Sequence, residues 1–167
     1  MFFRKPDSKP ATSGSTATLA AVVSEHMPDD DQPTRELVAA VAGLLASVAY
    51  ADRAFSEQEQ QHVHEVLGRI AGLSERGAAA IFAVLQRQGA LIAVSNMHAY
   101  TRHLRENAEL PLRREVLDAL LDLAASDGAI SLTESDLLRR TANALGLEQD
   151  DYLRAQAKHR DRLSVLK

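Results

Sequence analysis

The sequence predicts an all-α protein, a single helical domain of roughly seven to eight helices built as two pseudo-repeats. Apolar residues recur every three or four positions through most of the chain, which is the spacing of one buried helix face. The chain is rich in Ala and Leu, contains no Trp and is only 4% aromatic, a composition typical of packed helices. A segment of eight residues, of the kind that joins two helices, occurs twice. At 167 residues the chain is long enough for one domain with a sizeable core.

The repeated segment, called the octet below, has the pattern Asp-x-Ala-apolar-Ser-x-x-Glu. Its first copy runs from Asp52 to Glu59 and its second from Asp127 to Glu134, so corresponding residues lie 75 positions apart. Each copy follows an apolar run and precedes another helical pattern. A motif repeated in this way predicts two related halves, each containing a helix, a tight loop and a second helix.

The Ser-x-x-Glu part of each octet is a helix-start signal known as a capping box. The side chains of Ser56 and Ser131 are expected to accept the backbone N–H three residues later, while the Glu reaches back to the Ser N–H. In the second octet Gly128 can adopt the positive φ that a tight turn after a helix requires. Capping makes no use of the Asp four residues before each Ser, which leaves Asp52 and Asp127 as candidate functional residues.

Residues 1–33 are predicted to be a flexible lead-in to the helical domain, which we expect to cover residues 34–167. The beginning of this lead-in is rich in Pro, Ser and Thr, which favour irregular structure. A short amphipathic helix is expected at about 17–27. An acidic segment bounded by Pro28 and Pro33 follows it and is typical of a solvated linker.

Three helices are predicted in the first half of the domain, at about 34–50, 56–72 and 74–89. The first combines an apolar stripe with Ala, Ser and Gly43 on its other face, so we expect it to be buried nearly all round. The residues of the stripe are Leu37, Val41, Leu44, Leu45 and Val48. The second helix starts at the first capping box, and the third starts at Ser74.

Four further helices are predicted in the second half, at about 90–107, 111–126, 131–145 and 148–163. The first of them is expected to contain a break or bend near Ser95-Asn96. Pro111 suits the first position of the next helix, because its missing N–H is not needed there. On that helix Asp118 and Asp122 are expected to face outward. The third of them starts at the second capping box, and Gly146 is expected to end it.

Charge and composition exclude several classes of protein. The formal net charge of −4 and the pI of about 5.8 argue against a nucleic-acid partner, since nucleic-acid-binding proteins usually carry a basic face. The chain contains no Cys, so it has neither disulfides nor thiolate metal ligands. No run reaches the ~18–20 apolar residues that span a bilayer, and the N-terminus lacks a signal-peptide pattern. We therefore expect a cytoplasmic protein without a transmembrane segment.

The second octet matches the last part of a calcium-binding EF-hand loop, with Asp127, Gly128, an apolar residue and Glu134. The two earlier ligand positions would be Leu123 and Ala125, which cannot coordinate an ion, so an ordinary EF-hand is excluded. A weaker site for a hard divalent cation, such as calcium or magnesium, remains open. Its candidate ligands are Asp52, Glu59, Asp127 and Glu134. The alternative is that both octets serve capping and loop structure alone.

No pattern in the sequence predicts an enzyme. The chain has no Gly-rich phosphate loop and no Gly-x-Ser-x-Gly nucleophile elbow. Glu59 and His62 share a helix face, but no second Glu-x-x-His accompanies them, which argues against a di-iron site. The basic residues from Arg154 to Lys167 are typical of a solvated helix end. A docking surface for an acidic partner is the alternative interpretation of that cluster.

Around the octets the sequence resembles the TerB-like family, which includes bacterial tellurite-resistance TerB proteins and the N-terminal domain of DjlA-type co-chaperones. The family pattern is a helix ending in Ala-Asp-Gly and then apolar-Ser-x-x-Glu at the start of the next helix, twice over. The resemblance covers about residues 34–158. It also includes Tyr100-Thr101 with Leu104, Leu137-Leu138-Arg139-Arg140, Leu145-Gly146-Leu147 and Asp151-Tyr152. Arg53 stands where the family has Gly, so the second octet is expected to be the stronger half-site.

The resemblance implies a non-enzymatic module of metal and stress responses. In such a module the loop acids gather on one surface, which binds a divalent cation, a protein partner or both. The positions that inherit this role are Asp52, Glu59, Asp127 and Glu134. The alternative is a pure protein-interaction scaffold without a metal site, in which the octets are only capped helix joints.

Overall fold

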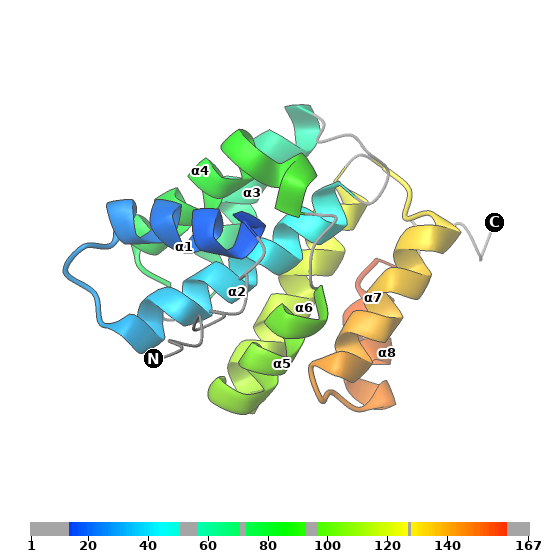
Figure 1. Ribbon diagram of the computed structural model, residues 1–167. Helices are drawn as coiled ribbons and strands as arrows, with labels where there is room; N and C mark the ends of the chain where they lie inside the picture. The colour runs from blue at the N-terminus through cyan, green and yellow to red at the C-terminus, as the bar shows by residue number, and fades with distance from the viewer. Residues whose placement is uncertain (1–13, 51–56, 71–72, 93–96, 127, 160–167) are drawn as a thin grey trace, which may run out of the picture.

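The computed structural model describes residues 14–50, 57–70, 73–92, 97–126 and 128–159. Within these ranges the chain forms eight α-helices and no strand (Figure 1). In chain order they are α1 (Gly14–His26), α2 (Gln32–Ala49), α3 (Glu57–Gly68), α4 (Glu75–Ile92), α5 (Met97–Asn107), α6 (Leu110–Ala125), α7 (Leu132–Ala144) and α8 (Gln149–Ala157). The all-α prediction is confirmed.

Helix α2 is the centre of the molecule, because it packs against α1, α4, α5, α6 and α7. Small side chains let these neighbours approach its backbone: Ala42, Ala46 and Ala49 are each 0% exposed. At its N-terminus the Asp31 carboxylate accepts the Thr34 N–H at 2.9 Å, which caps the helix. From Val38 onward almost every residue of α2 is buried, so the expected burial on nearly all sides is confirmed.

Helix α1 belongs to the same hydrophobic core as the rest of the molecule. It packs against α4 and α2. Its side chains Leu19, Val22, Val23 and the adjacent Met27 are each 6% exposed or less and join the contiguous core. The short helix expected at about 17–27 is therefore present. The core begins well before residue 33, where the sequence alone placed the boundary between a lead-in and the folded domain.

Helix α6 connects the two ends of the molecule. It packs against α2 and α3 and also against α7 and α8, and Figure 1 shows α7 and α8 at the end away from α1. Its inner face is fully buried, with Val116, Leu117, Leu120 and Leu123 each at most 1% exposed. Helix α6 thus holds both the joint that leads into α7 and the two C-terminal helices.

The helix boundaries differ from the predicted ones in the middle of the chain. Helix α4 does not end near Gly89 but continues to Ile92, and α5 begins at Met97. A Gly inside a helix costs only about 1 kcal/mol relative to Ala, which is not enough to end a helix. The helix expected at 90–107 is therefore α5 from Met97 onward, while residues 90–92 belong to α4. The expected break or bend near Ser95-Asn96 lies outside the described residues.

The carboxylates of α6 that were expected to face outward lie against basic side chains. Lys158 Nζ lies 2.9 Å from Asp118 Oδ2, and His159 Nε2 lies 2.9 Å from Asp122 Oδ1. Arg69, which follows α3, reaches Asp122 Oδ2 at 2.9 Å, and the Asp122 side chain is only 19% exposed. The described part of the basic C-terminal cluster is thus not simply a solvated helix end, because two of its residues tie α8 to α6.

Asp151 anchors the start of α8. Its carboxylate accepts the Arg114 Nε–H at 2.7 Å and the Glu148 N–H at 3.1 Å, and the residue is 9% exposed. Desolvation acts to raise the pKa of this carboxyl. The hydrogen bonds from Glu148 and Arg114, together with the positive charge of Arg114, outweigh desolvation and hold the pKa of Asp151 below its ordinary value.

The depressed pKa predicts how stability depends on pH. A carboxyl of this kind stabilises the folded state above its unfolded pKa, near ~3.9 for Asp, and the contribution is lost as the pH falls through the lower folded pKa. We expect Asp151→Asn to lower Tm at neutral pH. The difference from the native chain should shrink as the pH falls below about 4 and through the lower pKa of the folded state. Thermal melts followed by circular dichroism measure it, with the exposed Asp150→Asn as a control. A Tm difference that is constant over this range contradicts the assignment.

Candidate functional site

The second octet forms the joint between α6 and α7. The Ser126 hydroxyl donates to the Leu123 carbonyl at 2.7 Å, and the Gly128 N–H donates to the Ala125 carbonyl at 3.2 Å. Gly128 has a φ of 123°, which residues with a side chain rarely adopt. Ile130 is 0% exposed, so it fastens the loop to the core just before α7 begins.

Ser131 and Glu134 form the reciprocal pair of a capping box at the start of α7. Ser131 Oγ accepts the Glu134 N–H at 3.1 Å, and Glu134 Oε2 accepts the Ser131 N–H at 2.7 Å. Ser131 is exposed, whereas Glu134 is only 6% exposed. The carboxylate of Glu134 is therefore buried within the joint, and one of its oxygens is already bonded to the backbone.

For the other candidate residues of the two octets, the structure describes no side chain. Asp52, Ser56 and Asp127 lie outside the described residues, and Glu59 lies in α3 without a described side chain. Helix α3 begins at Glu57, one residue after the position that the expected capping Ser occupies. The gathering of the four loop acids on one surface stays a prediction.

A metal centre requires several ligands that converge on one ion. Among the residues whose surroundings the structure describes, no three or more His, Cys, Asp or Glu side chains do so. Of the four candidate acids, Glu134 is the one with a described side chain. Calcium takes about six to eight oxygen ligands, so an ion at this joint would need oxygens besides those of Glu134.

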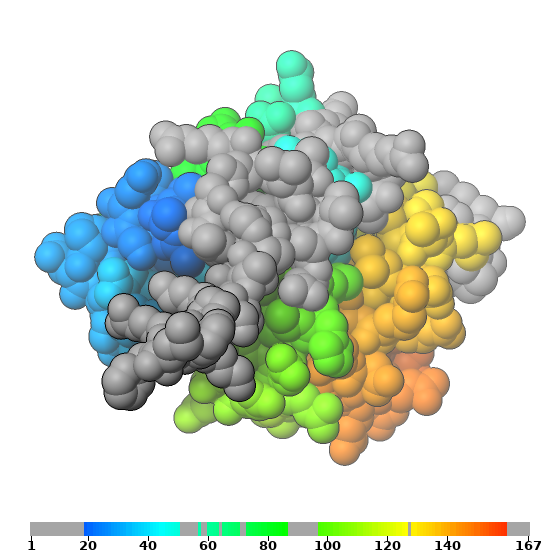
Figure 2. Space-filling model, in the orientation of Figure 1, coloured from blue at the N-terminus to red at the C-terminus, as the bar shows by residue number. Residues whose placement is uncertain are grey.

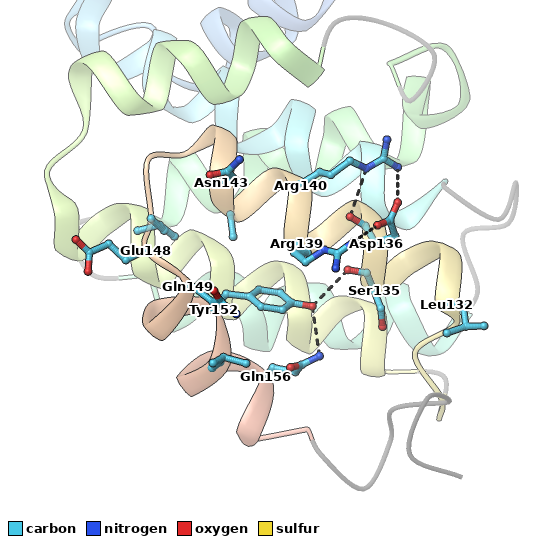
Figure 3. Close-up of a pocket in the computed structure, with 13 residues that line it drawn as sticks. Leu132, Ser135, Asp136, Arg139, Arg140, Asn143, Glu148, Gln149, Tyr152 and Gln156 are labelled. Atoms are coloured by element: carbon cyan, nitrogen blue, oxygen red, sulfur yellow. Dashed lines mark hydrogen bonds and ion pairs between the residues drawn. The ribbon is translucent and has the colours of Figure 1, made fainter.

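A groove of about 740 Å³ lies between α7 and α8. Its walls include Leu132 and Arg139 from α7 and Tyr152 from α8 (Figure 3). Leu153 of α8 also lines the groove. Helix α7 lies at the surface of the face drawn in Figure 2, in yellow to orange. The groove could not be recognised from a motif, because its residues come from two helices and share no regular spacing in the sequence. The feature that could have indicated the groove is the pair Leu132 and Leu153, two large apolar residues that fall outside the buried faces of their helices.

The fold and the joint define the class of the protein, an all-α domain in which a buried Glu closes a capped helix joint. The family model described as tellurite resistance protein TerB matches residues 38–157, and the chain belongs to this family. The resemblance observed in the sequence is thereby confirmed. No curated protein and no solved structure gives a significant match. None of the described helices is both long and apolar enough to cross a membrane.

Proposed function

We propose that this TerB-family chain is a non-enzymatic, cytoplasmic stress-response module that binds a divalent cation, a protein partner or both through its loop acids. The observation that carries the proposal is the Asp ahead of each capping box. The family match at residues 38–157 spans both octets, and each octet begins with an Asp that the capping box does not use.

The donor set favours a hard cation such as calcium or magnesium, because carboxylate oxygens are the ligands that these ions prefer. Asp127 and Glu134 flank the turn at Gly128, whereas Arg53 places a positive charge beside Asp52. The second octet is accordingly the stronger half-site. Tellurite itself is not the expected ligand, since carboxylates repel an oxyanion and the chain has no thiol to reduce it.

The second candidate function is a protein-interaction scaffold without a metal site. The observation that favours it is the capping box, in which Glu134 accepts the Ser131 N–H and is 6% exposed. That role accounts for Glu134 without any ion. In this case the octets fix the helix joints, and the partner binds elsewhere on the surface.

Three variants of the second octet separate the two functions. Glu134→Gln keeps the cap, because Gln also serves in a capping box, but removes the charge. Ser131→Ala removes the cap at a cost of about 0.5–2 kcal/mol but leaves every carboxylate in place. Calorimetric titration with Ca²⁺, Mg²⁺, Mn²⁺ and Zn²⁺ should show weaker cation binding in Glu134→Gln and Asp127→Asn. Ser131→Ala should lower Tm and leave cation binding unchanged.

If no ion binds the native chain at millimolar concentration, the metal part of the proposal is wrong and the scaffold remains. If Ser131→Ala weakens cation binding as much as Glu134→Gln does, the carboxylates act only through the stability of the joint.

A further inference from the structure

Two leucines are exposed on the walls of the groove between α7 and α8. Leu132 is 63% exposed and Leu153 is 47% exposed. They are two of the three large apolar side chains that are exposed in the described part of the chain, and both line this groove. Single exposed leucines are ordinary on a protein surface, but two that line one concave surface indicate an interaction site.

Two arginines of α7 line the same groove. Arg139 lies 2.6 Å from Asp136 Oδ1, and Arg140 lies 3.2 Å from Asp136 Oδ2, while both arginine side chains are 69% exposed. Figure 3 shows both guanidinium groups directed to this one carboxylate. On the α7 wall one negative charge therefore orients two positive ones, which leaves an excess positive charge and N–H donors on that wall. Glu148, from the start of α8, makes the lining neutral as a whole.

Tyr152 makes the groove a preformed surface. It is 7% exposed, its hydroxyl donates to the Ser135 carbonyl at 3.3 Å, and the hydroxyl accepts from Gln156 Nε2 at 3.4 Å (Figure 3). The first of these bonds joins the tyrosine of α8 to the backbone of α7, and the second holds its hydroxyl from within α8. A wall that is ordered before binding lowers the entropy lost when a partner docks.

We propose that this groove docks an amphipathic helix of a partner protein, whose apolar side chains cover Leu132 and Leu153 and whose carboxylates pair with Arg139 and Arg140. A volume of about 740 Å³ has room for several side chains of such a helix. Apolar and acidic residues one helical turn apart match a groove that presents leucines and guanidinium groups together. A basic helix would meet the excess positive charge on α7 and be disfavoured.

The negative charge of Glu148 determines how the partner helix is oriented in the groove. Glu148 also lines the groove, at the start of α8, and Figure 3 shows it on the opposite side from Arg139 and Arg140. The acids of the partner are therefore directed toward α7. This inference goes beyond the proposed function, because the groove residues are not the loop acids and their contacts require no cation.

The test uses the full chain and a labelled helical peptide of about 14 residues, or four turns of helix, with Leu and Glu on one face. Fluorescence anisotropy in the presence of a chelator should show binding, and the same peptide with Lys for Glu should bind more weakly. Leu132→Ser combined with Leu153→Ser should weaken binding roughly tenfold. Arg140→Glu should reverse the preference and favour the Lys peptide.

Two matched controls lie outside the groove. Leu110→Ser changes the third exposed leucine, which is 36% exposed, and Arg102→Glu changes an exposed arginine of α5. Both should bind the Glu peptide as the native chain does. The proposal is wrong if groove and control variants bind alike, or if inorganic phosphate displaces the peptide and the leucine substitutions have no effect. It is also wrong if sedimentation shows that the leucine substitutions abolish a dimer of this chain while no peptide binds.

Discussion

A chain that begins at Gln32, and so lacks α1, is expected to lose most of its folding stability. The truncation removes four buried apolar side chains, Leu19, Val22, Val23 and Met27. Full burial of such a side chain contributes about 1.5–3 kcal/mol, so the four together approach the whole stability of a typical domain, about 5–15 kcal/mol. The truncation also exposes the apolar residues of α4 and α2 that α1 covers. Urea unfolding followed by circular dichroism measures the loss.

Point substitutions within α1 check that packing, and not chain length, causes the effect. Leu19→Ala should destabilise the full chain by about 2–5 kcal/mol, the usual range for a buried leucine. Ala20→Ser, at the exposed neighbouring position, should change stability by no more than about 0.5 kcal/mol. If the chain beginning at Gln32 unfolds at the same urea concentration as the full chain, residues 1–33 are a lead-in, as their composition alone indicates.

The helices could be predicted because their signals are local. The spacing of Leu37, Val41 and Leu44 identifies α2, and the Ser-x-x-Glu pattern that begins at Ser131 identifies the start of α7. The position of α1 in the core could not be predicted in the same way. Its apolar face needs α4 and α2 to cover it, and the sequence near α1 does not indicate which helices lie there. Composition near the N-terminus therefore favoured a lead-in.

In the candidate site and around it, local contacts could be predicted from the sequence, whereas contacts between distant residues could not. The capping bond between Ser131 and Glu134 spans three residues and follows from the motif. The pair between Lys158 and Asp118 spans 40 residues, and the pair between Arg69 and Asp122 spans 53. These charges come together only because α3 and α8 both pack against α6. From their spacing within single helices, the same residues are expected to be solvated. The groove between α7 and α8 depends on packing in the same way.

At Gly43 the Tyr100 ring of α5 lies directly against the backbone of α2. A Cβ atom at this position would lie 2.5 Å from Tyr100 Cε2 and 2.6 Å from Cδ2, well inside van der Waals contact. Tyr100 is 5% exposed, so its ring has little freedom to move aside. Gly43→Val is expected to destabilise the chain by about 3 kcal/mol, at the upper end of what overpacking usually costs. Urea unfolding measures the change.

Gly68 supplies the matched control, because nothing lies within 4 Å of a Cβ atom built there. Gly68→Val should change stability by no more than about 0.5 kcal/mol. Tyr100→Leu should rescue part of the Gly43→Val defect, with a coupling of about 0.5–3 kcal/mol, because it removes the ring that the valine meets. Tyr100→Phe keeps that ring and should not rescue. Equal costs at Gly43 and Gly68 would show that helix propensity, and not the approach of α5, sets the effect. Tyr100, Thr101 and Leu104 belong to the segment between the octets that resembles the TerB-like family, and all three are buried in the structure. The close approach of the Tyr100 ring to Gly43 of α2 gives the position of Tyr100 a physical reason.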